Sequence, residues 1–142
     1  MANVHKDFHG ALSYGIQFIL DVYGLPGLEK YLQGLADTVY APLVEKLKTE
    51  GLSALRDHWQ EIFTVEGGEF ELREEGEVLV LNVLACPAIT HIRTQNYSIS
   101  PQFCEHTRIL NKAICVRAGY ACSVDYDQAA GRCVQRFWKE GS

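Results

Sequence analysis

Six side chains able to bind a metal or attack an electrophile gather in the second half of this chain of 142 residues. Five are thiols and one is an imidazole: Cys86, Cys104, His106, Cys115, Cys122 and Cys133. Thiolates and imidazoles are common zinc ligands, and a deprotonated thiol is also a nucleophile. The chain has no C-x-x-C pair, H-E-x-x-H helix, G-x-S-x-G turn or glycine-rich phosphate loop. Spacing alone must therefore decide which of the six can act together.

Cys104 and His106 fall in the first turn of a predicted helix that opens at Pro101. Free amides and the positive end of the helix dipole lower the pKa of a thiol there, which predicts an activated Cys104. His106 can join it only if the turn is irregular, because residues two apart point to different sides of a regular helix. Cys115 lies three turns further on, roughly 16 Å along the axis, and is predicted to be a small core residue. A helix cap with a buried thiol is the alternative for Cys104.

The remaining thiols lie on predicted strands. Cys86 ends a strand just before a proline, at a strand–helix junction of the kind that often carries functional residues, although a packed strand end fits it equally well. Cys122 and Cys133 lie on facing strands of one hairpin. A loop at residues 128–130 sets Cys133 opposite Asp125, on the same side as Gln135, and turns Cys122 to the other face, although a one-residue slip reverses this. We therefore expect only Cys133 of this pair at a site.

Four further residues are candidates for proton transfer and substrate binding. His9 belongs to a polar i, i+4, i+8 stripe at the edge of the apolar face of the first predicted helix, so it can point into a pocket, although a surface position is commoner. An imidazole there could move protons during hydrolysis. Arg108 or Arg132 could hold a substrate carboxylate in a two-pronged contact. Gln135, on the side of the sheet that we assign to the site, completes the predicted substrate-binding set.

The elements that must position these residues follow from apolar periodicity. The 3.6-residue period predicts four helices, over residues 3–23, 26–40, 43–49 and 52–63. Strand patterns predict two β-hairpins, over 69–84 and 120–138, separated by a short helix at 87–93 and a long one at 101–118. We expect an α+β fold, with N-terminal helices packed on an antiparallel sheet built from two β-hairpins with an intervening helix. The length predicts a single domain, 1–142.

Composition excludes several classes of protein. Hydrophobic residues make up 47% of the chain and charged residues 22%, as in ordinary globular proteins. The net charge is -5 and the basic residues are scattered, so we expect no nucleic-acid partner. No apolar run approaches the length of a membrane span, so we expect no membrane partner. The first residues lack the pattern of a signal peptide, which predicts a cytoplasmic protein whose cysteines stay thiols or metal ligands.

Four stretches resemble the L-2-amino-thiazoline-4-carboxylic acid hydrolase-like family. They are His9-Gly-Ala-Leu-Ser-Tyr-Gly-Ile, Val-Leu-Ala-Cys86-Pro-Ala-Ile, Phe-Cys104-Glu-His106-Thr and Gly131-Arg-Cys133-Val-Gln-Arg-Phe. Each motif is short, but together they span most of the chain. The resemblance implies hydrolytic opening of a small ring that contains sulfur and nitrogen, giving a cysteine derivative.

The last hairpin, with its Gly-x-Cys-x-x-x-Phe pattern, is also similar to the 4-vinyl-reductase-type small-molecule-binding domain. That domain is α+β, dimerises and often holds zinc through Cys and Glu near this hairpin. The resemblance therefore implies a homodimer or higher homo-oligomer with a zinc site. No Glu-x-x-Cys precedes Cys133, so Asp125 or Asp127 would have to supply the acidic ligand.

Three functions fit these patterns. The first is a hydrolase-like enzyme acting on a small sulfur/nitrogen heterocycle or a related C–N or C–S bond, with His9 as proton shuttle. In it, either zinc or another transition metal activates water, or Cys104 is the nucleophile. The predicted metal ligands are Cys86, Cys104, His106 and Cys133. The second is a non-catalytic small-molecule or metal-binding sensor module, whose metal site would be closed by four protein ligands. The third is a packing or oligomerisation domain whose thiols all lie in the core.

Overall fold

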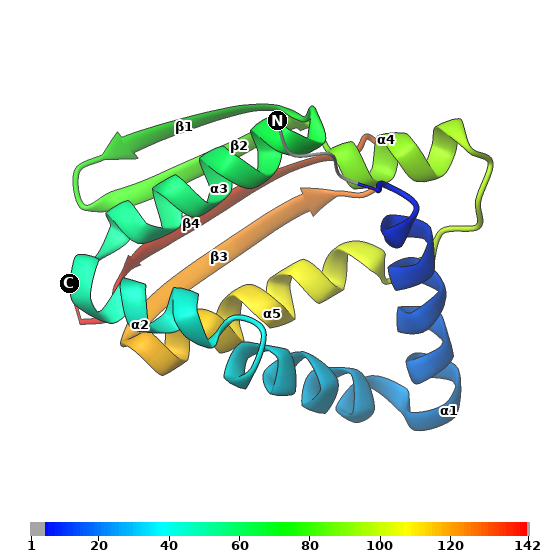
Figure 1. Ribbon diagram of the computed structural model, residues 1–142, viewed down its shortest axis with the longest axis horizontal. Helices are drawn as coiled ribbons and strands as arrows, with labels where there is room; N and C mark the ends of the chain where they lie inside the picture. Colours follow the sequence, from blue (N-terminus) through cyan, green and yellow to red (C-terminus); the bar gives the residue numbers. More distant parts are fainter. Residues whose placement is uncertain (1–4, 142) are drawn as a thin grey trace.

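The computed structural model describes residues 5–141, which form five helices and one four-stranded antiparallel sheet (Figure 1). The N-terminal helices are α1 (Phe8–Asp37), α2 (Ala41–Glu50) and α3 (Leu52–Glu66). The first hairpin is β1 (Glu69–Glu75) and β2 (Val78–Ala85), followed by α4 (Pro87–Thr94) and α5 (Phe103–Ala118). The second hairpin is β3 (Tyr120–Asp127) and β4 (Arg132–Lys139). This is the α+β fold that the sequence predicts, with helices packed against an antiparallel sheet.

The two hairpins join through their second strands, so the sheet order is β1-β2-β4-β3. The helices gather on one face of the sheet (Figure 1). On that face β2 presents Leu79, Leu81 and Val83, which are all fully buried. Their partners on β4 are Phe137, Gln135 and Cys133 respectively. The apolar side chains of the central strands therefore form the floor against which the helices pack.

Helix α1 joins the first two predicted helices. Its backbone breaks at Gly24, whose φ of 72° lies in the left-handed region, and Pro26 follows inside the helix. Glycine tolerates that conformation and proline opens the next turn, which explains why the pattern predicts two helices there. The predicted start at residue 3 lies outside the described residues. The ordered helix starts at Phe8, and α5 starts at Phe103, two residues later than predicted.

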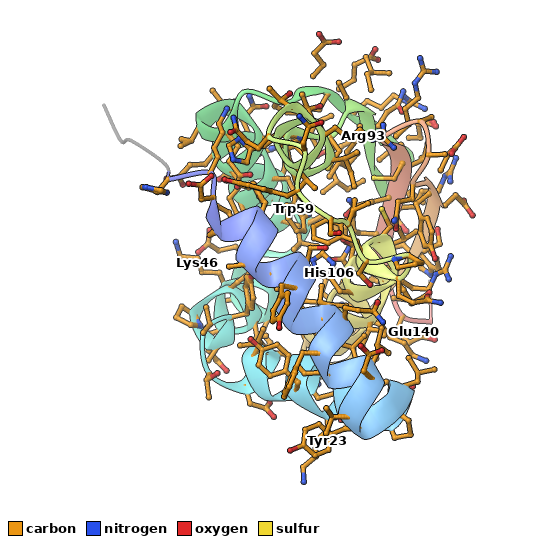
Figure 2. The ribbon with its side chains drawn as sticks, turned by 90° about the vertical axis from the view of Figure 1, so that its right-hand side faces the viewer. Tyr23, Lys46, Trp59, Arg93, His106 and Glu140 are labelled. Carbon is orange, nitrogen blue, oxygen red and sulfur yellow. The ribbon has the colours of Figure 1, made fainter. Side chains whose placement is uncertain are left out.

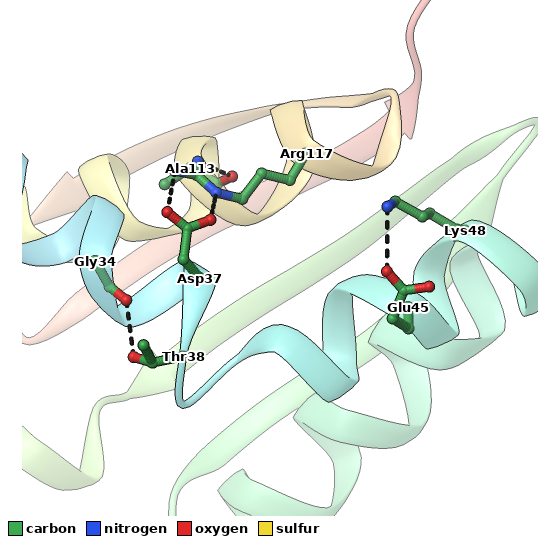
Figure 3. A network of polar contacts seen from close by, with 7 residues as sticks. All are labelled: Gly34, Asp37, Thr38, Glu45, Lys48, Ala113 and Arg117. Atoms are coloured by element: carbon green, nitrogen blue, oxygen red, sulfur yellow. Dashed lines mark hydrogen bonds and ion pairs between the residues drawn. The ribbon is translucent and has the colours of Figure 1, made fainter.

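A polar contact fixes the far end of α1 to α5. Arg117 on α5 donates from Nε and Nη2 to the two carboxylate oxygens of Asp37, and its Nη1 donates to the carbonyl of Ala113 (Figure 3). Thr38 closes the last turn of α1 by donating to the carbonyl of Gly34 at 2.8 Å. The end of α1 is thereby tied to the end of α5.

The register of the second hairpin differs from the predicted one by a residue. Cys133 pairs with Tyr126, not Asp125, and Cys122 pairs with Phe137. Paired residues share a face of an antiparallel sheet, so Cys122 lies on the same, helix-covered face as Cys133. The prediction that Cys122 points the other way is therefore wrong. The turn is one residue longer than assumed, because Gly131, with a φ of 70°, belongs to it.

Two apolar clusters fill the space between helices and sheet. One gathers α2, α3 and the second half of α5 on the sheet around Phe137, and the other gathers α1 and α4 around Phe103. Leu110, in the middle of α5, packs against both clusters. None of the helices within residues 5–141 has the length and apolar character needed to cross a membrane.

Candidate functional site

A cavity of about 380 Å³, partly open to solvent, is lined by residues of α1, α3, α4, α5 and the sheet. Its wall is largely apolar, with Leu12, Trp59 and Val83 among the contributors. Figure 2 shows Trp59 and His106 in the middle of the molecule, beside α1. A cavity of this size, apolar with a few convergent polar groups, is typical of small-molecule sites.

Most of the predicted site residues line this one cavity. The four predicted metal ligands Cys86, Cys104, His106 and Cys133 all do so, although they come from the β2–α4 junction, α5 and β4. The same holds for His9, Arg132 and Gln135. Distant parts of the chain therefore bring thiols and imidazoles to a common space. Arg108 does not line the cavity.

His9 and Glu66 form a buried pair at the cavity wall. His9 lies in the first turn of α1 and Glu66 ends α3, and His9 Nε2 is 2.8 Å from Glu66 Oε1. Their side chains are only 7% and 14% exposed. A carboxylate accepts and cannot donate, so Nε2 carries a proton, and in a neutral imidazole the lone pair then lies on Nδ1. This is the arrangement in which a carboxylate orients an imidazole that takes up a proton.

His106 is held as a neutral ring. Its Nδ1 contacts the carbonyl of Phe103, which only accepts, so Nδ1 is the protonated nitrogen and Nε2 is left with a lone pair. Burial lowers the pKa of His106, the Phe103 carbonyl partly opposes this, and nearby His9 adds to the lowering. His106 therefore offers the cavity an uncharged hydrogen-bond acceptor. The turn of α5 is regular, so His106 and Cys104 point in different directions and no hydrogen bond joins them among the described residues.

The three cavity thiols are held in their neutral form. Burial, with nearby Cys86 and Cys133 adding to its effect, raises the pKa of Cys104 to about 12, and Arg93 opposes them only in part. Burial also raises the pKa of Cys86 and of Cys133. The prediction that the start of α5 activates Cys104 is therefore wrong. Desolvation outweighs the helix dipole at this position.

The amide of Cys104 is already bound. Its N–H donates to Oε1 of Gln128 at 2.9 Å, and Nε2 of Gln128 donates to the carbonyl of Ser100 at 2.8 Å. Arg93 on α4 donates to the carbonyls of Gln128 and Ala129. The tip of the second hairpin is thereby fastened to the end of α4 and to the start of α5. These hydrogen bonds hold β4, and therefore Cys133, against α4 and α5.

The donors present do not fit a metal ion as they stand. Among residues 5–141 no group of three or more His, Cys, Asp or Glu side chains is placed to hold one. The acidic ligand implied by the second resemblance is missing too, because the register turns Asp125 outward, where it contacts Arg136 at 3.3 Å. Asp127 is also exposed and accepts from the amide of Ala130. An ion would require the thiols to move together, so we derive no step through a metal.

The predicted substrate-binding residues have different surroundings. Arg108 forms a bidentate contact with Glu105, at 2.7 and 2.9 Å, and donates to the carbonyl of Val124. Its guanidinium is therefore occupied away from the cavity. Arg132 borders the cavity at the start of β4 and is exposed. Gln135 is buried and hydrogen-bonded to Asn111.

The other two cysteines lie apart from the cavity. Cys115 is 1% exposed within the apolar core, which confirms its predicted place there. A hydrogen bond from Cys115 lowers the pKa of Cys122, and Lys112 adds to the lowering, while burial opposes it. The same contact and burial raise the pKa of Cys115. Cys122 is therefore the thiol whose surroundings most favour a thiolate among the five.

Sequence reasoning missed Glu66, Asn111 and Tyr126, which all line the cavity. A signal for Glu66 exists, because it continues the stripe of Leu55, Trp59 and Phe63 in α3 at helical spacing, and a carboxylate on an apolar stripe is unusual. Asn111 is likewise polar on the inward side of α5. Tyr126 could not be found without the register.

Compared with models of known protein families, with curated proteins and with solved structures, the chain matches none of them. The two resemblances noted in the sequence therefore stay predictions, and the site rests on its own geometry.

Proposed function

We propose that this chain binds a small molecule in the cavity and hydrolyses it, with His9 as the proton acceptor. The observation that carries the proposal is the buried contact between His9 and Glu66 at the wall of a largely apolar cavity. Burying an ionisable pair is costly, and such pairs are common where a site needs an oriented base. The resemblance to the thiazoline hydrolase-like family supports a small ring containing sulfur and nitrogen as the substrate.

In the proposed step a water molecule is the nucleophile. His9 Nδ1 takes a proton from the water as its oxygen bonds to the ring carbon that carries both nitrogen and sulfur. Glu66 stabilises the imidazolium that forms. The electron pair of the carbon–nitrogen double bond moves to the nitrogen, which receives that proton from His9. The hydroxyl of the resulting adduct then gives its proton to His9 as it becomes a carbonyl, the bond from that carbon to sulfur or nitrogen breaks, and His9 passes this proton to the departing atom. The neutral His106 can accept a hydrogen bond from the water or the ring, and Arg132 can hold a carboxylate of the substrate.

Water is preferred to Cys104 as the nucleophile because a thiol with a pKa of about 12 is almost entirely protonated at neutral pH. The described residues also provide no imidazole bonded to Cys104 to remove its proton. Zinc stays a prediction, and Cys86, Cys104, His106 and Cys133 are the residues that would hold it. The five free cysteines support the prediction of a reducing compartment such as the cytoplasm.

A non-catalytic small-molecule-binding module is the second candidate. Its support is that three neutral thiols and an apolar wall surround the cavity, which suits binding without chemistry. It uses the same pocket, and the two proposals differ only in whether His9 transfers a proton.

The test follows hydrolysis of L-2-amino-thiazoline-4-carboxylic acid by mass spectrometry, which distinguishes the ring-opened product from the protein's own thiols. We expect His9→Asn to lose about a hundredfold or more in kcat, the usual contribution of a general base. Glu66→Gln keeps the hydrogen bond without the charge and should lose less. His5→Asn is the matched control, since His5 is exposed. Cys104→Ser should retain turnover.

Two results would contradict the proposal. Turnover that survives in His9→Asn but is lost in Cys104→Ser would move the chemistry to the thiol. Saturable binding of the ring compound without turnover, unchanged in His9→Asn, would favour the binding module.

We also propose that the chain self-associates through α1. Tyr14, Phe18, Val22 and Leu25 form a stripe along its outer side at helical spacing, and all are at least 47% exposed. An added Cβ at Gly15, beside this stripe, would meet nothing within 4 Å, so a second helix could approach closely. A second copy of the chain offers the same stripe, which suits an isologous helix pair.

A further inference from the structure

Two buried amide side chains face each other across the cavity wall. Asn111 on α5 is 2% exposed and Gln135 on β4 is 3% exposed, and both line the cavity. Asn111 Nδ2 donates to Gln135 Oε1 at 2.7 Å. Gln135 Nε2 in turn contacts Cys133 Sγ at 3.4 Å. The pair ties the helix to the strand and needs no charge to do so.

Part of this pair is left unbonded toward the cavity. Asn111 Oδ1 has no hydrogen-bond partner among residues 5–141. Among these residues, the buried side-chain nitrogen and oxygen atoms that are inaccessible to solvent and lack a hydrogen bond are His58 Nε2 and Trp59 Nε1. Asn111 Oδ1 is not one of them, so it must be accessible to solvent. Because Asn111 lines the cavity, Oδ1 faces the cavity. The second proton of Asn111 Nδ2 is also unused. Asn111 therefore has one unused acceptor and one unused donor.

A purely structural pair explains this arrangement poorly. Joining α5 to β4 requires only the bond between the two amides, and the unused oxygen and proton then cost free energy in an otherwise apolar wall. A bound molecule that offers the complementary donor and acceptor removes that cost. If the oxygen and nitrogen of both amides are exchanged, Asn111 accepts from Gln135 instead of donating to it. Asn111 then still has one unused acceptor and one unused donor.

We propose that Asn111, positioned by Gln135, recognises a planar edge carrying adjacent N–H and C=O groups on a small ring-shaped ligand. Lactams and cyclic ureas have such an edge. Asn111 Oδ1 accepts the N–H and its free proton binds the carbonyl, which gives two parallel hydrogen bonds. The inference rests on the proposed function only in placing a small molecule in the same cavity, and it does not depend on proton transfer by His9.

The test uses two bicyclic probes of the same shape. Isocarbostyril is a lactam with the N–H and C=O edge, and isocoumarin carries a ring oxygen in place of the N–H. Binding is followed by NMR of the uniformly labelled full chain, through the side-chain NH₂ signals of Asn111 and Gln135. We expect the lactam to bind about tenfold more tightly than the lactone, the effect of one buried hydrogen bond plus an unfavourable oxygen–oxygen contact.

Variants identify the group responsible. Asn111→Leu keeps the approximate size of the side chain and should abolish the preference, whereas Gln33→Leu, which changes an exposed amide on α1, should retain it. Equal affinity of the wild type for both probes, or a preference that persists in Asn111→Leu, overturns the inference. If Asn111→Leu does not fold, the wild-type ratio and the shift of the Asn111 signals decide alone, and absence of that shift overturns the inference.

The same experiment separates this inference from the proposed hydrolysis. A His9→Asn variant that loses turnover but keeps the lactam preference supports both. Failure of the preference with His9-dependent turnover intact removes only the recognition by Asn111. A kept preference without any turnover removes only the hydrolysis.

Discussion

The five thiols should differ strongly in their rate of alkylation, and Cys104 should be among the slowest. Iodoacetamide reacts with the thiolate, so the rate follows the fraction of each thiol that is deprotonated. Burial and two neighbouring thiols raise the pKa of Cys104 from its usual 9.0 to about 12. At about pH 8 this lowers the thiolate fraction about a thousandfold relative to an ordinary cysteine.

Cys122 should react first. The hydrogen bond from Cys115 and the charge of Lys112 lower its pKa, and its side chain is partly exposed. Native protein treated briefly, then digested and analysed by mass spectrometry, gives the modified fraction at each position. Cys86 and Cys133, whose pKa values burial raises, should fall with Cys104 in the slow group.

The control is the same reaction in denaturant, where all five cysteines should react at similar rates. Cys122→Ser should remove the fast phase and leave the slow group unchanged. Rapid modification of Cys104 in the native protein, with a half-maximal rate below about pH 8, would refute the reasoning. It would show an activated thiol and return Cys104 to the role of nucleophile.

Three further results follow from the packing and the charges. Gly68→Ala should lower the free energy of unfolding in urea by about 1–3 kcal/mol, because the added Cβ would lie 2.9 Å from Pro87 Cδ. Gly34→Ala is the control: its Cβ would meet nothing within 4 Å, so it should be neutral or stabilising by up to about 1 kcal/mol. Burial lowers the pKa of His106 below its usual value of 6.5. At pH values below 6.5 the unfolded chain therefore binds more protons than the folded one, and the free energy of unfolding falls as the pH falls, by at most about 1.4 kcal/mol per pH unit. His106→Gln should flatten that dependence in unfolding curves between about pH 5 and 7. Phe18→Glu should shift any oligomer seen by light scattering toward monomer.

Much of the fold was predictable because each element carries its own apolar period. Helices α2 and α3 begin within two residues of the predicted positions, and the strands of both hairpins agree closely with the alternating segments. The exception is α1, where Gly24 and Pro26 suggest an interruption that the structure resolves as a kink within one helix. A local sequence pattern indicates the local conformation only. It does not indicate whether tertiary packing lets a helix continue past a residue that interrupts it.

The site was predictable in its members more than in its chemistry. Cys86, Cys104 and Cys133 lie at ends of elements, and ends that meet at one side of a fold bring such residues together. Their protonation could not be predicted, because desolvation depends on neighbours that are distant in the sequence. The partner of His9 was missed for the same reason, since Glu66 is fifty-seven positions away.

The register of the second hairpin decides which chemistry the cavity can support. With Cys133 opposite Asp125, as the spacing suggested, a carboxylate would share the inner face with the thiols, and an acid beside three sulfurs is a plausible zinc site. The observed pairing puts Tyr126 there and turns Asp125 to solvent. The inner face then has neutral thiols, an aromatic ring and the amide of Gln135, and its ionisable pair comes from α1 and α3 instead. A one-residue shift in a turn therefore moves the expected chemistry from a metal-bound water to a base held by Glu66.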